Sequence, residues 1–424
     1  MQKKLLAAAV GSALGAVAAP SFAQNATVNV YGALVAEYAS IRHGQRNATD
    51  SYQNIDQWQN PGSAIGFRGE EKLGGGLSAW FQCETTMDYR GSNNSTAGGA
   101  NSSGAQGLCN RDSALGIKGG FGNVFMGNWG MPLKRVTNDL VGAEDTGVYG
   151  VGRLLYGNSS TYGTTAPNAA AGTGDGRLNA GAWRRRQSNL VGYDTPVFSG
   201  FQGMFAYTTA NMATGATSAQ LKPRLWGLGV TYNNGPIALG FGYEKHKDMY
   251  GTVVAGCPAG SGACAGSDER AWALTGSYTF SNNLKLGAQY TRQTANSAVT
   301  QSDVRVNAWM VGMDWKISGP HGVRANYTRA GDVTGGVTAA GALGISTPAR
   351  PAAAALASGG FTDTGANQWS IRYVHQLSKR TEATIGYVRL DNKRNANYEL
   401  GGTNTTVLAG SDSNAVAIGM KHSF

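Results

Sequence analysis

No stretch after residue 23 reaches the run of about 18 uninterrupted apolar residues that a membrane-spanning helix requires. The chain is also poor in charge, since Asp, Glu, Lys and Arg make up only 14% of it. It has five histidines, and none is flanked by a recognisable Ser or Cys nucleophile motif. They are His43, His246, His321, His375 and His422. These absences predict a protein with no helical span, no catalytic residues and no bound cofactor.

Nucleic acid has no support as a partner, although the formal net charge is +10. A nucleic-acid-binding surface would show a basic helix or basic residues interleaved with aromatics, and the sequence has neither. A metal site is not predicted either, because no zinc-finger histidines lie near the four cysteines.

The N-terminus has the pattern of an export signal. Two lysines precede an apolar stretch over residues 5–19, and Ser21, Phe22 and Ala23 follow. This order is typical of a cleaved secretory signal. We expect residues 1–23 to be removed and residues 24–424 to form a single domain, because no domain boundary is visible.

Two neighbouring stretches, 270–280 and 283–293, alternate apolar and polar residues with a two-residue gap between them. One face of the first stretch carries Trp272, Leu274, Gly276, Tyr278 and Phe280. Successive strand side chains point to opposite faces, so the pattern predicts a hairpin with one apolar wall and one wet wall. A soluble sandwich would alternate in the same way. The export signal and the last stretch of the chain favour a membrane barrel. That stretch also alternates apolar and polar residues and ends on Phe424. A strand at the chain terminus is expected in a closed barrel, because closure leaves no strand edge exposed to lipid.

The rest of the mature chain continues this array. We predict sixteen strands, near residues 27–40, 63–70, 77–87, 111–118, 122–128, 184–194, 201–209, 223–232, 237–247, 270–280, 283–293, 304–316, 321–329, 367–377, 381–391 and 413–424. Short Gly- and Asn-rich turns alternate with longer loops such as 41–62, 88–110 and 330–366. An even number of strands with short turns at one rim is typical of an outer-membrane β-barrel. Sixteen strands leave room for an aqueous channel.

One connection breaks this rhythm, because some fifty residues over 129–182 separate two strands. A connection that long is commonly functional. Its first half, 131–156, carries both apolar and acidic residues, so we expect it to fold inward and narrow the lumen.

The chain resembles the general porins of the Gram-negative outer membrane, of the kind found in Neisseria, Comamonas, Bordetella and Burkholderia. The resemblance rests on short pieces in a fixed order. They are Val30-Tyr31-Gly32, Ile65-Gly66-Phe67-Arg68-Gly69-Glu70, Arg111 ahead of Gly116-Ile117-Lys118, Tyr193-Asp194-Thr195-Pro196 and Lys421-His422-Ser423-Phe424. It implies a homotrimer of sixteen-stranded barrels, each with an inward-folded third loop, through which ions and small hydrophilic solutes diffuse passively. It also implies outer-membrane lipid, lipopolysaccharide and the barrel assembly machinery as partners, the last through the terminal strand at Phe424.

The resemblance further implies a constriction in which basic wall residues face acidic residues of the third loop and sort solutes by charge. Carried over by position and strand alternation, the wall residues are Arg68, Arg111, Arg184 and Arg186. The candidates on the loop are Asp139, Glu144 and Asp145. Ala64 replaces the arginine usual in relatives and so removes one expected charge. We expect a weak preference for anions.

The four cysteines suggest disulfides, and four allow three connectivities. Cys83 with Cys109 would close the second loop, and Cys257 with Cys264 the fifth. Loop-closure entropy gives these bridges roughly 3.5 and 2.3 kcal/mol. Two other functions stay open at this point: a solute-specific channel, which needs a stacking track or a closed pocket, and an outer-membrane hydrolase.

Overall fold

The computed structural model describes residues 27–44, 53–89, 108–156, 183–209, 224–247, 268–296, 303–335, 362–401 and 407–424. The strands of the first half are β1 (Thr27–His43), β2 (Gln53–Gln59), β3 (Ala64–Gly74), β4 (Leu77–Thr86), β5 (Ser113–Gly119), β6 (Gly122–Gly130), β7 (Arg186–Asp194), β8 (Phe201–Thr209) and β9 (Arg224–Asn234). Those of the second half are β10 (Ile237–Lys247), β11 (Asp268–Thr279), β12 (Leu284–Asn296), β13 (Asp303–Ser318), β14 (His321–Ala330), β15 (Thr334–Gly335), β16 (Ala366–Ser378), β17 (Thr381–Asn392) and β18 (Ser413–Ser423). Two short helices are α2 (Pro132–Val136) and α3 (Gly152–Tyr156). Within the described residues, no helix has the length and hydropathy to cross a membrane.

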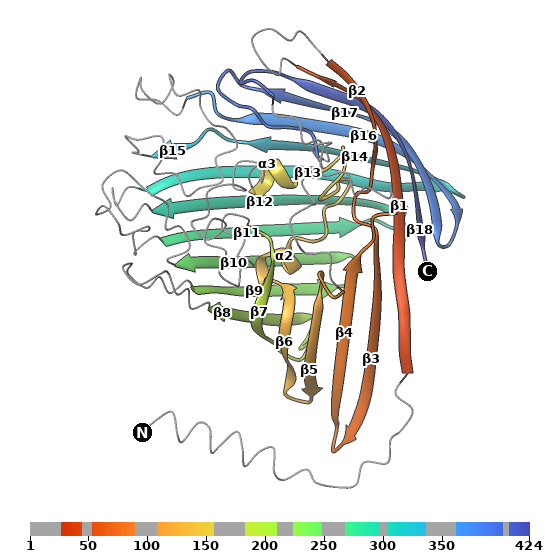
Figure 1. The fold of residues 1–424 in the computed structure, drawn as a ribbon, viewed down its shortest axis with the longest axis vertical. Helices are drawn as coiled ribbons and strands as arrows, with labels where there is room; N and C mark the ends of the chain where they lie inside the picture. Colours follow the sequence, from red (N-terminus) through yellow and green to blue (C-terminus); the bar gives the residue numbers. More distant parts are fainter. Residues whose placement is uncertain are drawn as a thin grey trace.

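The strands form an all-β, sixteen-stranded antiparallel barrel, which confirms the predicted fold (Figure 1). Each strand pairs with its neighbours along the chain, and β1 pairs with β18 to close the sheet. The eighteen labelled segments make sixteen barrel strands, because β2 lies in line with β3 and β15 lies in line with β14. β1 pairs first with β3 and then with β2, and β15 pairs with β13 beyond the end of β14.

The β2 extension corrects one predicted boundary. We expected a loop over residues 41–62, but β1 continues to His43 and pairs there with Gln53–Gln59. The outer face of β2 carries one large apolar residue, Trp58, which is 59% exposed. One apolar residue is too short a pattern to reveal a strand. The predicted signal, residues 1–23, lies outside the described residues.

The two faces of the barrel differ as the alternation predicts. On β11, Leu274 and Tyr278 point outward and are 50% and 43% exposed, whereas the inward-facing Ala271 and Ala273 are 1% and 0% exposed. On β18, Ile418 points outward and is 53% exposed. An apolar exterior is the surface that hydrocarbon solvates.

The turns and the chain end follow from local chemistry. Gly75 between β3 and β4 has a φ of +59°, and Asn283 between β11 and β12 has +60°. Gly and Asn adopt this left-handed conformation most readily. At the seam, Phe424 N donates to Gly32 O at 3.0 Å, and Gly32 N donates to Phe424 O at 3.2 Å. The terminal residue therefore continues the pairing of β18 with β1, while its role in assembly stays a prediction.

Candidate pore constriction

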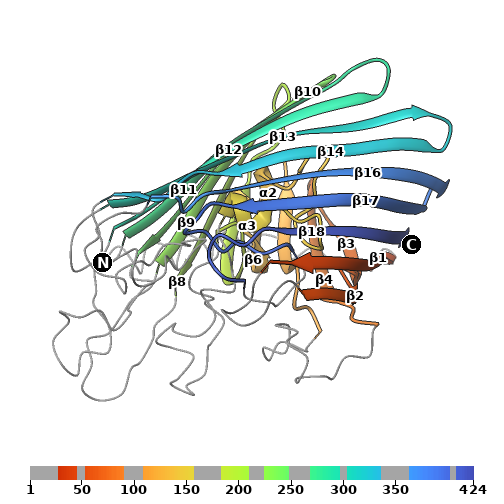
Figure 2. The ribbon, with the colours of Figure 1, turned by 90° about the horizontal axis from the view of Figure 1, so that it is seen from above.

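Segment 131–156, the first half of the longest predicted connection, packs against the inner wall of the barrel. Helix α2 contacts β9 and β10, and helix α3 contacts β12, β13, β14 and β16. Figure 2 shows both helices inside the ring of strands. The wall beneath them is built from small residues. A Cβ on Gly242 would lie 3.0 Å from Leu133 Cα, and one on Gly240 would lie 2.6 Å from Val136 Cγ1.

Polar side chains of the wall hold the backbone of this segment from several strands. Those on β12 and β14 donate to its carbonyl groups, and Glu37 on β1 accepts from its backbone. Near the seam, the Tyr149 side chain of the segment donates to a backbone carbonyl of β18. The pairs are Thr291 Oγ1 to Leu155 O (2.9 Å), Gln293 Nε2 to Leu155 O (2.9 Å), Asn326 Nδ2 to Gly142 O (3.1 Å), Val148 N to Glu37 Oε1 (2.9 Å) and Tyr149 OH to Ala417 O (3.1 Å). The segment therefore runs along the inner wall from β9 and β10 to the barrel seam between β1 and β18.

Two of the predicted acidic residues anchor the segment to basic residues of the wall. Glu144 forms an ion pair with Arg372 of β16, whose side chain is 1% exposed and whose guanidinium carbon lies 4.7 Å from the Tyr149 ring centroid. Asp139 forms an ion pair with Lys285 of β12 at 2.5 Å. The loop acids are thus paired directly with cations and are not separated from them by an open gap.

The third acidic residue, Asp145, lies between two cations. Arg184 forms an ion pair with it and also donates from Nε to Thr137 Oγ1 at 3.0 Å. Lys134 Nζ lies 3.5 Å from Asp145 Oδ2. The Arg184 side chain is 2% exposed and Asp145 is 38% exposed. Arg184 therefore fixes the segment from its buried side, while Asp145 is the more exposed partner and Lys134, at 12% exposure, is mostly covered.

Burial and neighbouring charges act on both of these groups. Burial, followed by the positive charge of Arg184, lowers the pKa of Lys134 to about 8. Burial raises the pKa of Asp145, but the charges of Arg184 and Lys134 outweigh it and hold that pKa below its usual value. At neutral pH both groups are charged.

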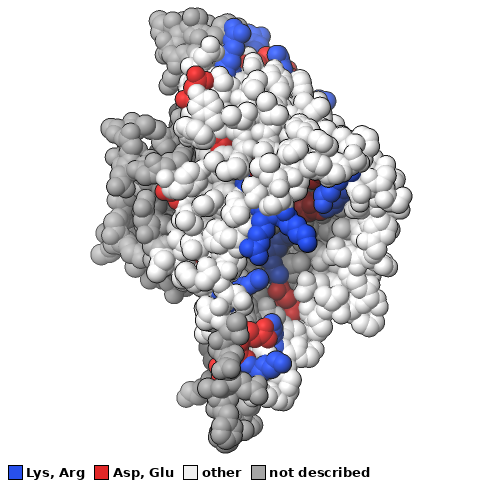
Figure 3. Space-filling view, turned by 90° about the vertical axis from the view of Figure 1, so that its right-hand side faces the viewer, with Lys and Arg blue, Asp and Glu red and all other residues white. Residues whose placement is uncertain are grey.

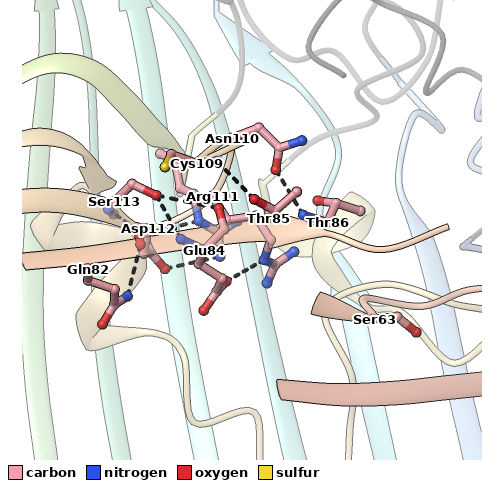
Figure 4. A network of polar contacts seen from close by, with 12 residues as sticks. Ser63, Gln82, Glu84, Thr85, Thr86, Cys109, Asn110, Arg111, Asp112 and Ser113 are labelled. Carbon is pink, nitrogen blue, oxygen red and sulfur yellow. Dashed lines mark hydrogen bonds and ion pairs between the residues drawn. The ribbon is translucent and has the colours of Figure 1, made fainter. Parts of the chain in front are cut away.

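The wall between β3 and β7 carries the remaining predicted arginines, and Figure 4 shows Arg111 among its polar neighbours. Arg111 forms an ion pair with Glu84 of β4, and Tyr31 OH donates to the other carboxylate oxygen of Glu84 at 3.2 Å. Arg68 shares the inner face of β3 with Gly66 and lies 5.1 Å from the Tyr31 ring centroid. Arg68 is exposed, and within the described residues it forms no ion pair.

A second pair of ion pairs continues this wall. Arg186 binds Asp112, with Nε 3.0 Å from Oδ1 and Nη2 3.1 Å from Oδ2. Arg135, which follows Lys134 on α2, binds both oxygens of Asp194 at 2.6 and 2.9 Å. The structure thus brings Arg68, Arg111 and Arg186 to one side of the bore. In Figure 3, Lys and Arg gather in a hollow near the middle of the molecule with acidic residues beside them.

Sequence reasoning missed several members of this site. Arg372 shares the inward parity of β16, a signal that the sequence contained. Glu84 likewise alternates with outward-facing Phe81 and Cys83 on β4. Lys134 and Arg135 gave no such signal, because a five-residue helix inside a long connection has no strand alternation to read.

Cys83 and Cys109 form a disulfide with their Cα atoms 4.6 Å apart, as one of the three connectivities predicted. Two hydrogen bonds also hold this end of the loop to β4, since Arg111 N donates to Glu84 O and Cys109 N donates to the side-chain Oγ1 of Thr85, both at 2.9 Å. The bridge therefore fixes the chain that presents Arg111. Cys257 and Cys264 lie outside the described residues.

Comparisons with known proteins agree with this architecture. A family model described as Gram-negative porin matches residues 7–396. Outer membrane porin protein 32 of Delftia acidovorans is 27% identical over the full length of both chains. Major outer membrane protein P.IB of Neisseria gonorrhoeae is 31% identical over 45% of each chain. Among solved structures, the anion-selective porin from Comamonas acidovorans superposes with a TM-score of 0.66 at 25% identity, covering 94% of this chain and all of that one.

Proposed function

Since the chain belongs to the Gram-negative porin family of outer-membrane channels, which are not enzymes, we propose that it passes ions and small hydrophilic solutes by general diffusion with a weak preference for anions. We further propose that residues 1–23 are removed on export and that the mature chain works as a homotrimer. The fold supports the first proposal because its inner face is polar and its outer face is apolar.

The observation that carries the anion preference is the grouping of basic side chains on the wall between β3 and β7 and on the start of segment 131–156. Arg111 and Arg186 are each balanced by one carboxylate, but Arg68 has none within the described residues. Lys134 shares Asp145 with Arg184. Cations therefore exceed carboxylates around this part of the bore, and the local potential favours anions.

Arg68 offers a direct test, because its removal breaks no ion pair of the described residues. A unit charge about 5 Å from the ion path contributes about 0.8 kcal/mol in water. Screening over a Debye length of about 8 Å reduces this to roughly 0.4 kcal/mol at physiological salt. Anions and cations shift in opposite directions, so Arg68→Gln should lower the anion-to-cation permeability ratio by at most about fourfold.

The assay is the reversal potential across a KCl gradient in a planar bilayer. Arg329→Gln is the matched control. It removes the same charge, but Arg329 is an exposed residue on the outer face of β14 and does not face the bore. We expect a shift toward cations for Arg68→Gln and none for Arg329→Gln. Cation preference in the wild-type channel would reject the proposal, and so would equal shifts in the two variants.

A further inference from the structure

A cluster of three aromatic side chains lies on the inner wall of the barrel. The ring centroids of Trp80 on β4 and of Phe125 and Trp129 on β6 are 5.5 to 5.9 Å apart. A Cβ on Gly116 would lie 2.6 Å from Trp80 Cε2, so the missing side chain lets the indole lie against β5. Phe125 is 2% exposed, whereas both indoles are partly exposed and present apolar surface toward the bore.

The two indoles form one side of a recess at the barrel end that carries the β3–β4 and β5–β6 turns. Its polar lining includes Ser78, Lys118, Asn123, Asp194 and Gln202. Trp80 Nε1 donates to Asn123 Oδ1 at 2.7 Å, which orients the amide and leaves Asn123 Nδ2 as a donor. Lys118 is directly paired with Asn123 across β5 and β6 and with Ser78 across β4 and β5. Two donors thus converge beside the aromatic surface.

The charges of the recess favour a carboxylate. Lys118 is bound to Glu70 at 2.6 Å, but both side chains are more than 40% exposed. Such an exposed pair contributes only about 0 to 1 kcal/mol, so a solute carboxylate can exchange with Glu70. The Asp194 carboxylate is balanced by both guanidinium nitrogens of Arg135 and repels an incoming anion little.

We propose that this recess is a binding subsite for a small aromatic carboxylate during passage through the channel. The ring stacks on the indoles of Trp80 and Trp129, and the carboxylate accepts hydrogen bonds from Lys118 Nζ and Asn123 Nδ2. The inference rests on the proposed function, because the solute reaches the recess through the bore. With this subsite, small aromatic carboxylates bind saturably on their way through the channel, while other solutes diffuse through it without saturation.

The test is the titration of single-channel KCl current through the full-length mature protein with benzoate. Hexanoate has the same charge without the ring, benzyl alcohol has the ring without the charge, and glucuronate has a hydroxylated ring with the charge. We expect benzoate to reduce the current with saturation, and the other three to need at least about tenfold higher concentration. Trp80→Leu and Lys118→Gln should each raise the half-blocking concentration of benzoate at least about fivefold.

Trp309→Leu is the control, since Trp309 is 37% exposed on the outer face of β13 and should not affect block. Lys118→Gln alters an exposed residue and keeps the test valid if Trp80→Leu fails to fold. Equal block by benzoate and hexanoate, equal block by glucuronate, or unchanged block in Lys118→Gln would each overturn the subsite. Failure of the proposed function would look different, because KCl current would be absent before any benzoate is added.

Discussion

The ion pair between Glu144 and Arg372 should control how tightly segment 131–156 is held against the wall. Arg372 also donates from Nη2 to Gly142 O at 3.3 Å and lies over the Tyr149 ring. Arg372→Met keeps an unbranched side chain in the site but removes the guanidinium, and with it both hydrogen-bond donors and the positive charge. Glu144, at 34% exposure, can then be solvated by water, so the loss falls short of that for a fully buried charge.

The magnitude follows from these contacts. A hydrogen bond to a charged group contributes about 1.5 to 3 kcal/mol, and a cation over an aromatic ring adds about 0.5 to 2 kcal/mol. These two losses are partly offset, because the variant no longer has to bury a charged guanidinium away from water. We take about 2 kcal/mol as the net loss, which raises the detached population of the segment roughly thirtyfold.

Hydrogen exchange measures that population directly. Val148 N, Gly150 N and Val151 N donate hydrogen bonds that form only while the segment is docked or folded on itself. We expect exchange of peptides from 143–156 to accelerate roughly thirtyfold in Arg372→Met. Arg324→Met is the matched control, since Arg324 sits on the same inner wall but binds Glu382. Unchanged exchange in a folded Arg372→Met protein would refute the anchoring role.

Two further outcomes are expected. Because the pKa of Lys134 is about 8, raising the pH from 6 to 9 removes one positive charge beside Asp145 and should reduce anion preference, as read from reversal potentials. Lys134→Met should abolish this component, and an identical pH profile in that variant would contradict it. The bridge between Cys83 and Cys109 closes a 26-residue separation, so the double Cys→Ser variant should lose about 3.5 kcal/mol of unfolding free energy in urea. Coincident unfolding curves would argue against a stabilising bridge.

Much of the barrel could be predicted because strand alternation is a local property. Leu274 and Ile418 are predicted to point outward because they are apolar and their immediate neighbours are small or polar. This prediction needs no information from distant parts of the chain. The same parity places Arg68 correctly on the inner face. The short turns were visible for a similar reason, since Gly75 and Asn283 suit left-handed backbone.

The constriction could be predicted only in part, because its contacts join residues far apart in the chain. Glu144 and Arg372 are 228 positions apart, and no periodicity links them. Arg184 has a φ of +59° and precedes β7, so strand alternation does not fix its direction. Ion pairing with Asp145 fixes it instead, and that contact depends on how segment 131–156 folds.

The most direct test of a water-filled bore inside an apolar wall is cysteine labelling on one strand. In a chain whose four native cysteines are replaced by serine, Ser277→Cys and Leu274→Cys place thiols on opposite faces of β11. The account predicts that a charged, membrane-impermeant thiol reagent modifies Ser277→Cys in a lipid bilayer and lowers the current, while Leu274→Cys stays unmodified. Faster modification of Leu274→Cys than of Ser277→Cys would contradict it.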